Sequence, residues 1–160
     1  MGFKSEVFVY ACLGKSLSER GWNKIMDFID RIKDKINNIP DIPIKIKKGY
    51  LSAVESLVIY PLPGGQVLTE YYNGVKDEQL NYEIAMKSQD GSKIEQTLWL
   101  ISDSLERTSE ITSFDGSFEF SRLTITSKPF INKADEQGWF VFLLDFQVKL
   151  TTFKEEQQHD

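Results

Sequence analysis

Apolar residues recur early in the chain with the spacing of a helix. They stand three or four positions apart, separated by charged and polar residues, at Trp22, Ile25, Met26, Ile29, Ile32 and Ile36. This spacing predicts an amphipathic helix from about Gly21 to Asn37. The helix should end before Pro40, because asparagines tolerate left-handed geometry and a proline cannot continue the helical hydrogen bonds.

The next apolar positions alternate with polar ones, which is typical of strands. Ile42, Ile44 and Ile46 alternate with Pro43 and lysines, and this pattern predicts a short half-buried or edge strand. A longer alternation predicts a strand that ends before Gly91, with its apolar positions at Leu80, Tyr82, Ile84 and Met86.

Between these strands lie two β-rich runs, Ser56–Tyr60 and Val67–Tyr72, separated by Pro61-Leu62-Pro63-Gly64-Gly65. Two prolines and two glycines disfavour both a helix and a continuous strand, so we expect a turn that joins two separate strands. The glycines do not form a phosphate-binding motif, because no Gly-Lys-Ser/Thr follows them.

A second helix is predicted to start at Ser92-Lys93-Ile94-Glu95, which has the form of a capping box. It should extend to about Arg107 with Trp99 beside its apolar stripe, which consists of Ile94, Leu98, Ile101 and Leu105.

The C-terminal third predicts two long strands. Phe118 and Phe120 would point away from Leu123 and Ile125 on an unbroken pleat, so we expect a bulge near Ser121-Arg122, in a strand that runs into Pro129. Asn132–Gly138 is hydrophilic and predicts a turn. The last strand has one continuous apolar face, formed by Phe140, Phe142, Leu144, Phe146, Val148 and Leu150. Its other face is apolar only at Trp139, Val141 and Leu143, so one end of the strand should be buried on both sides.

The order of these elements suggests an α+β fold, with two amphipathic helices packed on one face of an antiparallel or mixed β-sheet. A length of 160 residues, 41% of them hydrophobic, suffices for one core. We expect residues 26–153 to form a single domain, residues 1–25 an N-terminal extension of uncertain role, and residues 154–160 a disordered polar tail.

Charge and composition argue against several classes of partner. The 19 basic and 24 acidic residues give a net charge of −5, which disfavours a nucleic-acid footprint and sequence-specific nucleic-acid binding. The apolar stretch Val7–Leu13 is far too short to span a membrane, so we expect a soluble protein.

Residues able to perform chemistry are scarce. The single histidine, His159, lies in the polar tail, and the single cysteine, Cys12, has no histidine in the folded body to act as its base. A lone cysteine also fits a protein kept in a reducing cytoplasm. We therefore predict no enzyme activity, no catalytic or metal-binding residue and no cofactor.

Some residues suit a protein interface instead. Tyr71, Tyr72, Trp99 and Trp139 occupy positions that the patterns do not assign to the core, and aromatic residues on polar faces are common at interfaces, although filling the core is an equal alternative for each. Asp135 and Glu136 lack the spacing of a calcium loop, so we interpret them as part of a solvated hairpin tip.

The residues from the second helix onward carry a resemblance to a known family. The Ile94–Leu105 helix, the run Phe118–Ile125, the turn Asp135–Trp139 and the strand Phe142–Leu150 resemble minor capsid proteins of phages that infect Gram-positive bacteria. That family is similar to tail terminators, which are small α+β proteins that form rings. The resemblance spans Met26 to about Phe153, and Met26 would suit the start of such a protein, so residues 1–25 fall outside it.

The resemblance implies a structural subunit of the virion tail or neck, assembled in the host bacterial cytoplasm. It implies a homo-oligomeric ring, commonly a hexamer, that ends growth of the tail tube and contacts tail-tube and head-connector proteins. A ring needs two different lateral patches. We assign axial docking to Pro61–Gly65, with Pro61, Gly64 and Gly65, and to Asn132–Gly138. We assign lateral contacts to the helix around Trp99 and to a strand edge near Tyr71-Tyr72.

Three alternatives remain at this stage. Another head–tail connector or stopper subunit would also oligomerise, and the sequence does not separate it from a terminator. A small-molecule-binding or nucleotide-binding α+β domain would need a concave pocket with converging polar groups. An enzyme that uses carboxylates alone is disfavoured, since no spaced pair of acidic residues stands out.

Overall fold

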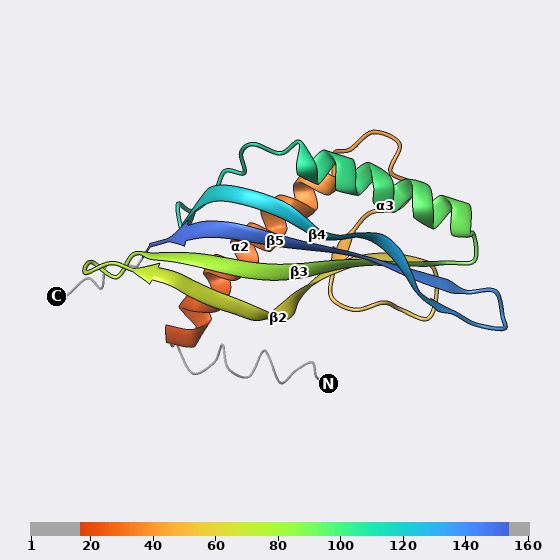
Figure 1. The fold of residues 1–160 in the computed structure, drawn as a ribbon, viewed down its shortest axis with the longest axis horizontal. Coiled ribbons are helices and arrows are strands. Elements are labelled where there is room, and N and C mark those ends of the chain that lie inside the picture. The colour runs from red at the N-terminus through yellow and green to blue at the C-terminus, as the bar shows by residue number, and fades with distance from the viewer. Residues whose placement is uncertain (1–16, 154–160) are drawn as a thin grey trace.

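A computed structural model describes residues 17–153, with side-chain surroundings from Asp27 onward. Two helices and five strands follow in the order α2 (Leu17–Asn37), β1 (Lys47–Lys48), β2 (Ser56–Glu70), β3 (Lys76–Ser88), α3 (Gly91–Glu106), β4 (Phe118–Ala134) and β5 (Phe140–Thr152). The strands form one mixed sheet in the order β1-β2-β3-β5-β4, in which only β1 and β2 are parallel (Figure 1). The predicted α+β class is confirmed.

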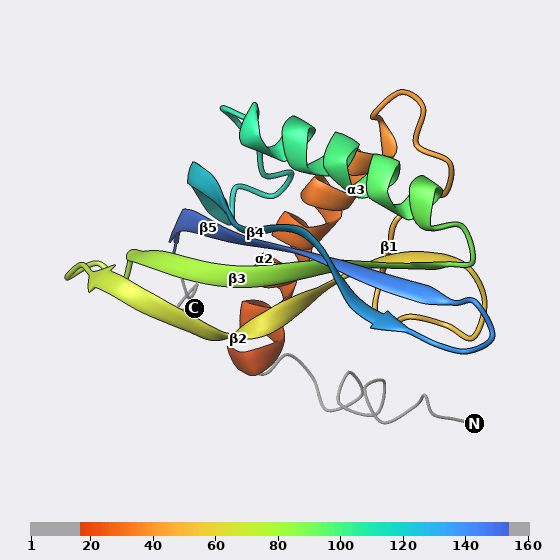
Figure 2. The same ribbon diagram turned by 45° about the vertical axis from the view of Figure 1, so that its right-hand side comes forward.

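The core lies between the two helices and one face of the sheet. The alternating faces predicted for β3 and β5 meet there, since Tyr82 pairs with Phe146 and Ile84 pairs with Leu144. The Tyr82 and Phe146 rings stack with centroids 5.5 Å apart. α2 contributes Ile29, Ile32 and Ile36 from its predicted stripe, together with Phe28, which was not predicted. α3 contributes its whole predicted stripe, which consists of Ile94, Leu98, Ile101 and Leu105. Figure 2 shows both helices lying across the same sheet.

Both predicted helices are present, but each begins earlier than predicted. α2 ends at Asn37 as predicted and begins at Leu17 instead of Gly21. The residue that caps α3 is Asp90, whose carboxylate accepts a hydrogen bond from the Lys93 backbone N–H at 3.1 Å. Ser92 lies inside the first turn, so the capping-box prediction placed the cap two residues too late, at Ser92 instead of Asp90. Aspartate and serine are both favoured caps, and Asp90 precedes Ser92 by two residues, which explains why the serine pattern was misleading.

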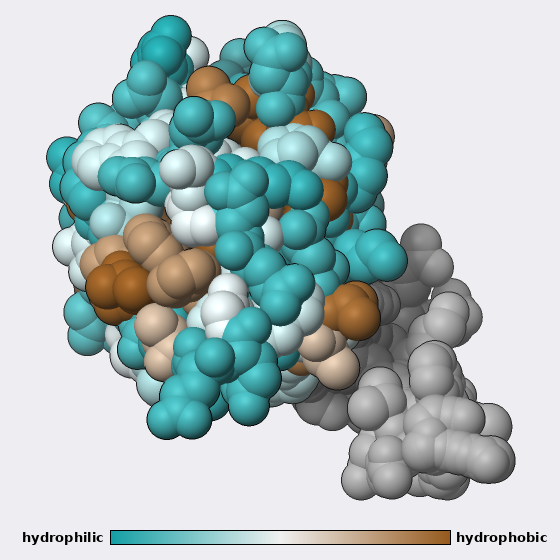
Figure 3. Space-filling model, turned by 90° about the vertical axis from the view of Figure 1, so that its right-hand side faces the viewer, coloured by the Kyte–Doolittle hydropathy of each residue, from teal (hydrophilic) through white to brown (hydrophobic). Residues whose placement is uncertain are grey.

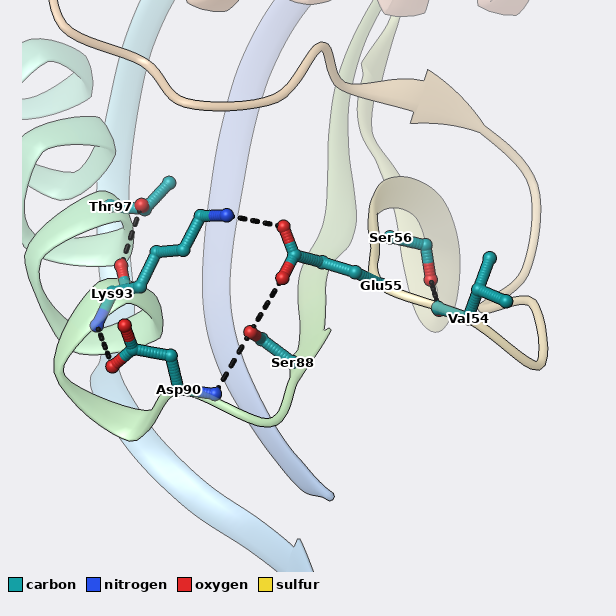
Figure 4. A network of polar contacts seen from close by, with 7 residues as sticks. All are labelled: Val54, Glu55, Ser56, Ser88, Asp90, Lys93 and Thr97. Carbon is teal, nitrogen blue, oxygen red and sulfur yellow. Dashed lines mark hydrogen bonds and ion pairs between the residues drawn. The ribbon is translucent and has the colours of Figure 1, made fainter. Parts of the chain in front are cut away.

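A polar network fixes the N-terminal end of α3 against the loop before β2 (Figure 4). The Lys93 ammonium contacts one oxygen of Glu55, and the Ser88 hydroxyl donates to the other at 2.8 Å. The Asp90 backbone N–H in turn donates to the Ser88 hydroxyl at 3.1 Å. These bonds lower the pKa of Glu55, with the hydrogen bond from Lys93 as the largest cause.

The strand predicted at Ile42–Ile46 is wrong, because the strand in this region is only the two residues of β1. The Asn37 side chain explains the difference. Its amide nitrogen donates to the Ile46 carbonyl at 3.3 Å, and its oxygen accepts from the Ile46 N–H at 2.8 Å. These backbone groups are therefore satisfied by a side chain instead of a neighbouring strand.

The turn predicted at Pro61–Gly65 is also wrong. β2 is one strand of 15 residues that passes through both prolines, with pairing to β3 interrupted between Leu62 and Gln66. Beyond Ile59, no described strand lies on the outer side of β2, so a proline there need not break a ladder of hydrogen bonds. Gly64 takes a φ of 99° at the interruption, a conformation that favours glycine.

β4 combines a confirmed prediction with two corrections. Its pairing to β5 shifts between Phe120 and Arg122, where the bulge was expected. The strand does not stop at Pro129 but continues to Ala134, because β4 is an edge strand and tolerates proline. The turn before β5 is consequently shorter than the predicted Asn132–Gly138 segment and begins at Asp135.

Some predictions fall outside the described residues. Cys12 and the segment Val7–Leu13 precede them, and His159 and the 154–160 tail follow them. The division at residue 26 falls within α2, and the role of residues 1–25 stays a prediction. Among the described residues, neither helix combines the length and the apolar character of a membrane-spanning segment.

Candidate assembly interface

Two hairpin turns lie at opposite ends of the sheet. Glu70 pairs with Lys76 just before the β2–β3 turn, whereas Ala134 pairs with Phe140 at the β4–β5 turn. The register of β3 and β5 places Lys76 beside Thr152 and Ser88 beside Phe140, so the two turns are separated by the full length of these strands. Figure 1 shows them projecting at the left and right of the molecule.

The β2–β3 turn consists of Tyr71–Gly74 and presents one free aromatic ring. The Tyr71 N–H donates to the Val75 carbonyl at 2.8 Å and closes the turn. The Tyr71 hydroxyl donates to Asp77 at 2.8 Å, and this bond raises the pKa of the tyrosine. Tyr72 is fully exposed. The two tyrosines therefore lie on the turn itself and not on the strand edge where they were predicted.

In the β4–β5 turn, the carboxylate of the first acidic residue, Asp135, forms hydrogen bonds within the turn itself. The Asp135 carboxylate accepts hydrogen bonds from the Gln137 N–H at 3.0 Å and the Trp139 N–H at 2.9 Å. Trp139 is half-buried, with the Lys87 ammonium 5.0 Å from its ring centroid. Glu136 is exposed. Of these three predicted residues, Glu136 is the one whose charged group faces solvent at the tip.

Pro61, Gly64 and Gly65 are exposed, but they lie along the side of β2 and not at either end of the sheet. They therefore lie in a strand and not in the loop that was predicted, and their role in docking stays a prediction. The sequence could not distinguish a turn from an irregular edge strand, because both accommodate prolines and glycines.

The outer surface of α3 carries a shallow apolar depression. It has a volume of about 420 Å³ and is lined by Gln96, Trp99, Leu100 and Asp103. Trp99 is 43% exposed, and the Lys128 ammonium from β4 lies 5.7 Å from its ring centroid. Of the two alternatives left open for Trp99, the surface or the core, the structure supports the surface.

Four exposed apolar residues on the strands escaped the sequence interpretation: Val67, Leu68, Phe130 and Ile131. A signal was present in the sequence, since two adjacent apolar residues in a strand cannot both face the core. Figure 3, which views the end of the molecule at the right of Figure 1, shows apolar side chains in separate patches among polar ones. Such patches suit contacts with other proteins.

The sheet face opposite the helices contains a carboxyl pair. Glu83 on β3 is the direct partner of Asp145 on β5, and the Tyr60 hydroxyl from β2 donates to Glu83. Burial and the neighbouring Glu83 raise the pKa of Asp145 to about 7. Among the described residues, the buried Oδ1 atom of Asp145 has no hydrogen-bond partner. No three described His, Cys, Asp or Glu residues gather in a way that could hold a metal ion.

A comparison with known protein families agrees with the resemblance noted in the sequence. A family described as bacteriophage tail terminator protein matches residues 22–152. A search of curated proteins gave no match. A chain in the solved structure titled "Virion of native gene transfer agent (GTA) particle" is similar with a TM-score of 0.49 and 10% sequence identity, over 75% of this chain and 84% of that chain.

Proposed function

Since the chain belongs to the bacteriophage tail terminator family and is thereby a structural subunit that joins head and tail, we propose that it acts as a ring that ends tail-tube growth. The ring sits in the tail or neck of the virion and is assembled in the host cytoplasm. Its work is mechanical and requires no catalysis, cofactor, membrane or sequence-specific nucleic acid.

The position of the two hairpin turns is the observation that carries this proposal. One turn lies at each end of the strands, so a ring whose axis runs along the strands presents Tyr72 on one face and Glu136 on the other. A fully exposed tyrosine is a common anchor at protein interfaces. The tyrosine face docks on the last ring of the tail tube, and the acidic face meets the head connector.

The sides of the subunit provide the contacts around the ring. A closed ring joins two different patches on each subunit, since every contact is head-to-tail. The apolar depression around Trp99 and Leu100 lies on α3, on the side of the subunit and away from both turns. We assign it to the lateral surface, together with the sheet edges.

A stopper or connector subunit, which would bind the head side first, is the alternative within the same class. The discriminating experiment mixes the protein with preformed tail tubes and, separately, with head connectors, followed by native mass spectrometry and negative-stain imaging. We expect rings at one end of each tube and no further growth when tube protein is added. Tubes that continue to grow, or binding to connectors alone, would contradict the terminator role.

A further inference from the structure

The loop before β4 exposes a phenylalanine that takes no part in the core. Phe114 is 73% exposed, which makes it the most exposed phenylalanine between Asp27 and Phe153. Ile111 and Phe118, on either side of it in the chain, are both buried. A single exposed apolar side chain is common on protein surfaces, so the contacts that hold Phe114 in place decide whether it has a role.

The Phe114 ring is covered on one face by Arg31 of α2. The centre of the guanidinium lies 3.8 Å from the ring centroid, which is a cation–π contact. Arg31 is itself fixed, because its Nε donates to the Thr112 carbonyl at 2.8 Å and its guanidinium lies 3.6 Å from the Asp34 carboxylate. The arginine therefore holds the ring in one orientation and leaves the rest of it accessible.

Hydrogen bonds order the loop on both sides of Phe114. The Ser113 hydroxyl donates to the Asp27 carboxylate, which ties the loop to α2. The Ser117 backbone N–H is shared between the Asp115 carboxylate at 2.9 Å and the Ser113 hydroxyl at 3.2 Å. An ordered loop loses little conformational freedom when it binds a partner, so the exposed ring is preorganised for an interface.

This loop lies at the same end of the sheet as the β2–β3 turn. Phe118 and Lys76, the first residues of β4 and β3, both pair with Thr152 of β5 and so lie in one row. Figure 1 shows the start of β4 and the β2–β3 turn at the left end of the molecule. Phe114 precedes this row on one strand as Tyr72 precedes it on another, so both aromatic side chains belong to one end of the subunit.

Acidic residues surround the exposed ring. Asp115 is exposed, and although partial burial opposes the effect, hydrogen bonds from Ser117 lower the pKa of Asp115 to about 2. Its carboxylate is therefore charged at neutral pH. Glu110 and Glu119 are also exposed, whereas Arg31 is only partly exposed. The partner surface that complements these charges is an apolar pocket with basic residues at its rim.

We propose that Phe114 is a second anchor through which the subunit docks on the tail tube, where it enters an apolar pocket rimmed by lysine or arginine side chains. Arg31 is a positioning residue that holds the ring outward. The inference rests on the proposed terminator role and adds to it a docking residue and the chemistry of the partner surface. Two aromatic anchors on separate loops fix the orientation of the subunit on the tube, which Tyr72 alone would not.

Binding to preformed tail tubes, measured by sedimentation, tests the anchor. Phe114→Ala should bind at least about tenfold more weakly than the unmodified protein, and Phe114→Leu, which keeps an apolar side chain, should recover part of the loss. The matched control is Val54→Ala, which truncates another exposed apolar residue, 63% exposed, in the loop before β2. Its binding should be unchanged, because β2 begins at the other end of the sheet, where Ser56 pairs with Lys87.

Circular dichroism and urea denaturation check that the variants fold. Unchanged binding by folded Phe114→Ala, or equal losses in Phe114→Ala and Val54→Ala, would overturn the anchor and leave the terminator role intact. Failure of the unmodified protein to bind tubes would overturn both proposals.

Two further variants test the surroundings of the ring. Arg31→Gln should weaken binding less than Phe114→Ala and should have no additional effect in a Phe114→Ala background, because the arginine acts through the ring. An additional loss there would overturn its positioning role. Added salt should weaken binding of the unmodified protein more than that of Asp115→Asn, which keeps an acceptor for the Ser117 N–H. Equal salt dependence of the two proteins would overturn the basic rim.

Discussion

Glu83 and Asp145 lie directly opposite each other on β3 and β5, on the sheet face that the helices leave open. Two neighbouring carboxyl groups are compatible when they share a proton, since both cannot be charged without repulsion. Burial, followed by the neighbouring Glu83, raises the pKa of Asp145 to about 7. The stability of the fold should therefore depend on pH near neutrality.

Deprotonation of Asp145 should destabilise the protein as the pH rises. Its pKa in the folded state lies above the ordinary value of 3.8. The stabilisation that comes from protonated Asp145 is therefore fully present below pH 3.8 and is lost as the pH rises through about 7. Solvent screening of this partly exposed pair limits the loss to about 1 kcal/mol. Urea denaturation at about pH 5 and about pH 8 should show this difference in the free energy of unfolding.

The neutral variant Asp145→Asn should remove most of this pH dependence and be at least as stable as the unmodified protein at about pH 8. Glu95→Gln, which neutralises an exposed carboxylate on α3, is the control and should retain it. An unchanged pH dependence in Asp145→Asn would show that the carboxyl pair is not its source.

The identity of the residue that caps α3 can be tested by comparing Asp90 with Ser92. Asp90→Ala removes the acceptor for the Lys93 N–H and should lower the free energy of unfolding by about 1 kcal/mol. Ser92→Ala should change it by less than about 0.5 kcal/mol, because Ser92 is exposed within the first turn. Chemical denaturation of both variants measures the difference. Equal losses, or a larger loss for Ser92→Ala, would mean that the capping box predicted from the sequence operates after all.

The periodicity of apolar residues correctly predicted those helices and strands whose buried face follows from their own geometry alone. The stripe Ile94–Leu105 and the alternation at Tyr82, Ile84 and Met86 follow directly from the geometry of a helix and a strand. The bulge beside Phe120 was predicted for the same reason, since a change of parity in an apolar alternation requires an extra residue.

Neighbours in space determine the parts that periodicity missed. Pro61 is compatible with a strand only because β1 is too short to reach it, and Ile46 is not in a strand because Asn37 satisfies its backbone. The interface candidates show the same limit. Tyr72 is free and Trp139 is half-buried under Lys87, although both were aromatic residues without an assigned place. Local composition contains no information on which chain segment lies alongside.

Leu98 and Trp99 are adjacent on α3, but truncating them should affect different properties: stability for Leu98 and oligomerisation for Trp99. Leu98 is fully buried in the core, so Leu98→Ala should lower the free energy of unfolding by about 2–5 kcal/mol. Trp99 lies in the outer depression, so Trp99→Ala should cost less stability than Leu98→Ala and should weaken oligomerisation on tail tubes. Urea denaturation and native mass spectrometry separate the two effects. Normal assembly of a folded Trp99→Ala protein would remove this surface from the ring contact.

Tyr72 at the β2–β3 turn offers the sharpest test of axial docking. Its side chain is fully exposed and no hydrogen bond of the turn involves it, so Tyr72→Ala should leave the free energy of unfolding unchanged within about 0.5 kcal/mol. If the ring docks through this turn, the variant should bind preformed tail tubes at least about tenfold more weakly, because exposed tyrosines often act as anchors at interfaces. Sedimentation with tubes measures the binding.

The control for Tyr72→Ala is a second exposed tyrosine away from the turn. Tyr50 lies in the loop before β2, is 86% exposed and contacts Tyr60, with ring centroids 5.7 Å apart and ring planes tilted by 32°. Tyr50→Ala should bind tubes as the unmodified protein does, since this loop lies away from the β2–β3 turn. Wild-type binding by Tyr72→Ala, or equal losses in the two variants, would contradict docking through the β2–β3 turn. A loss confined to Tyr72→Ala would identify this end of the sheet as the one that faces the tube.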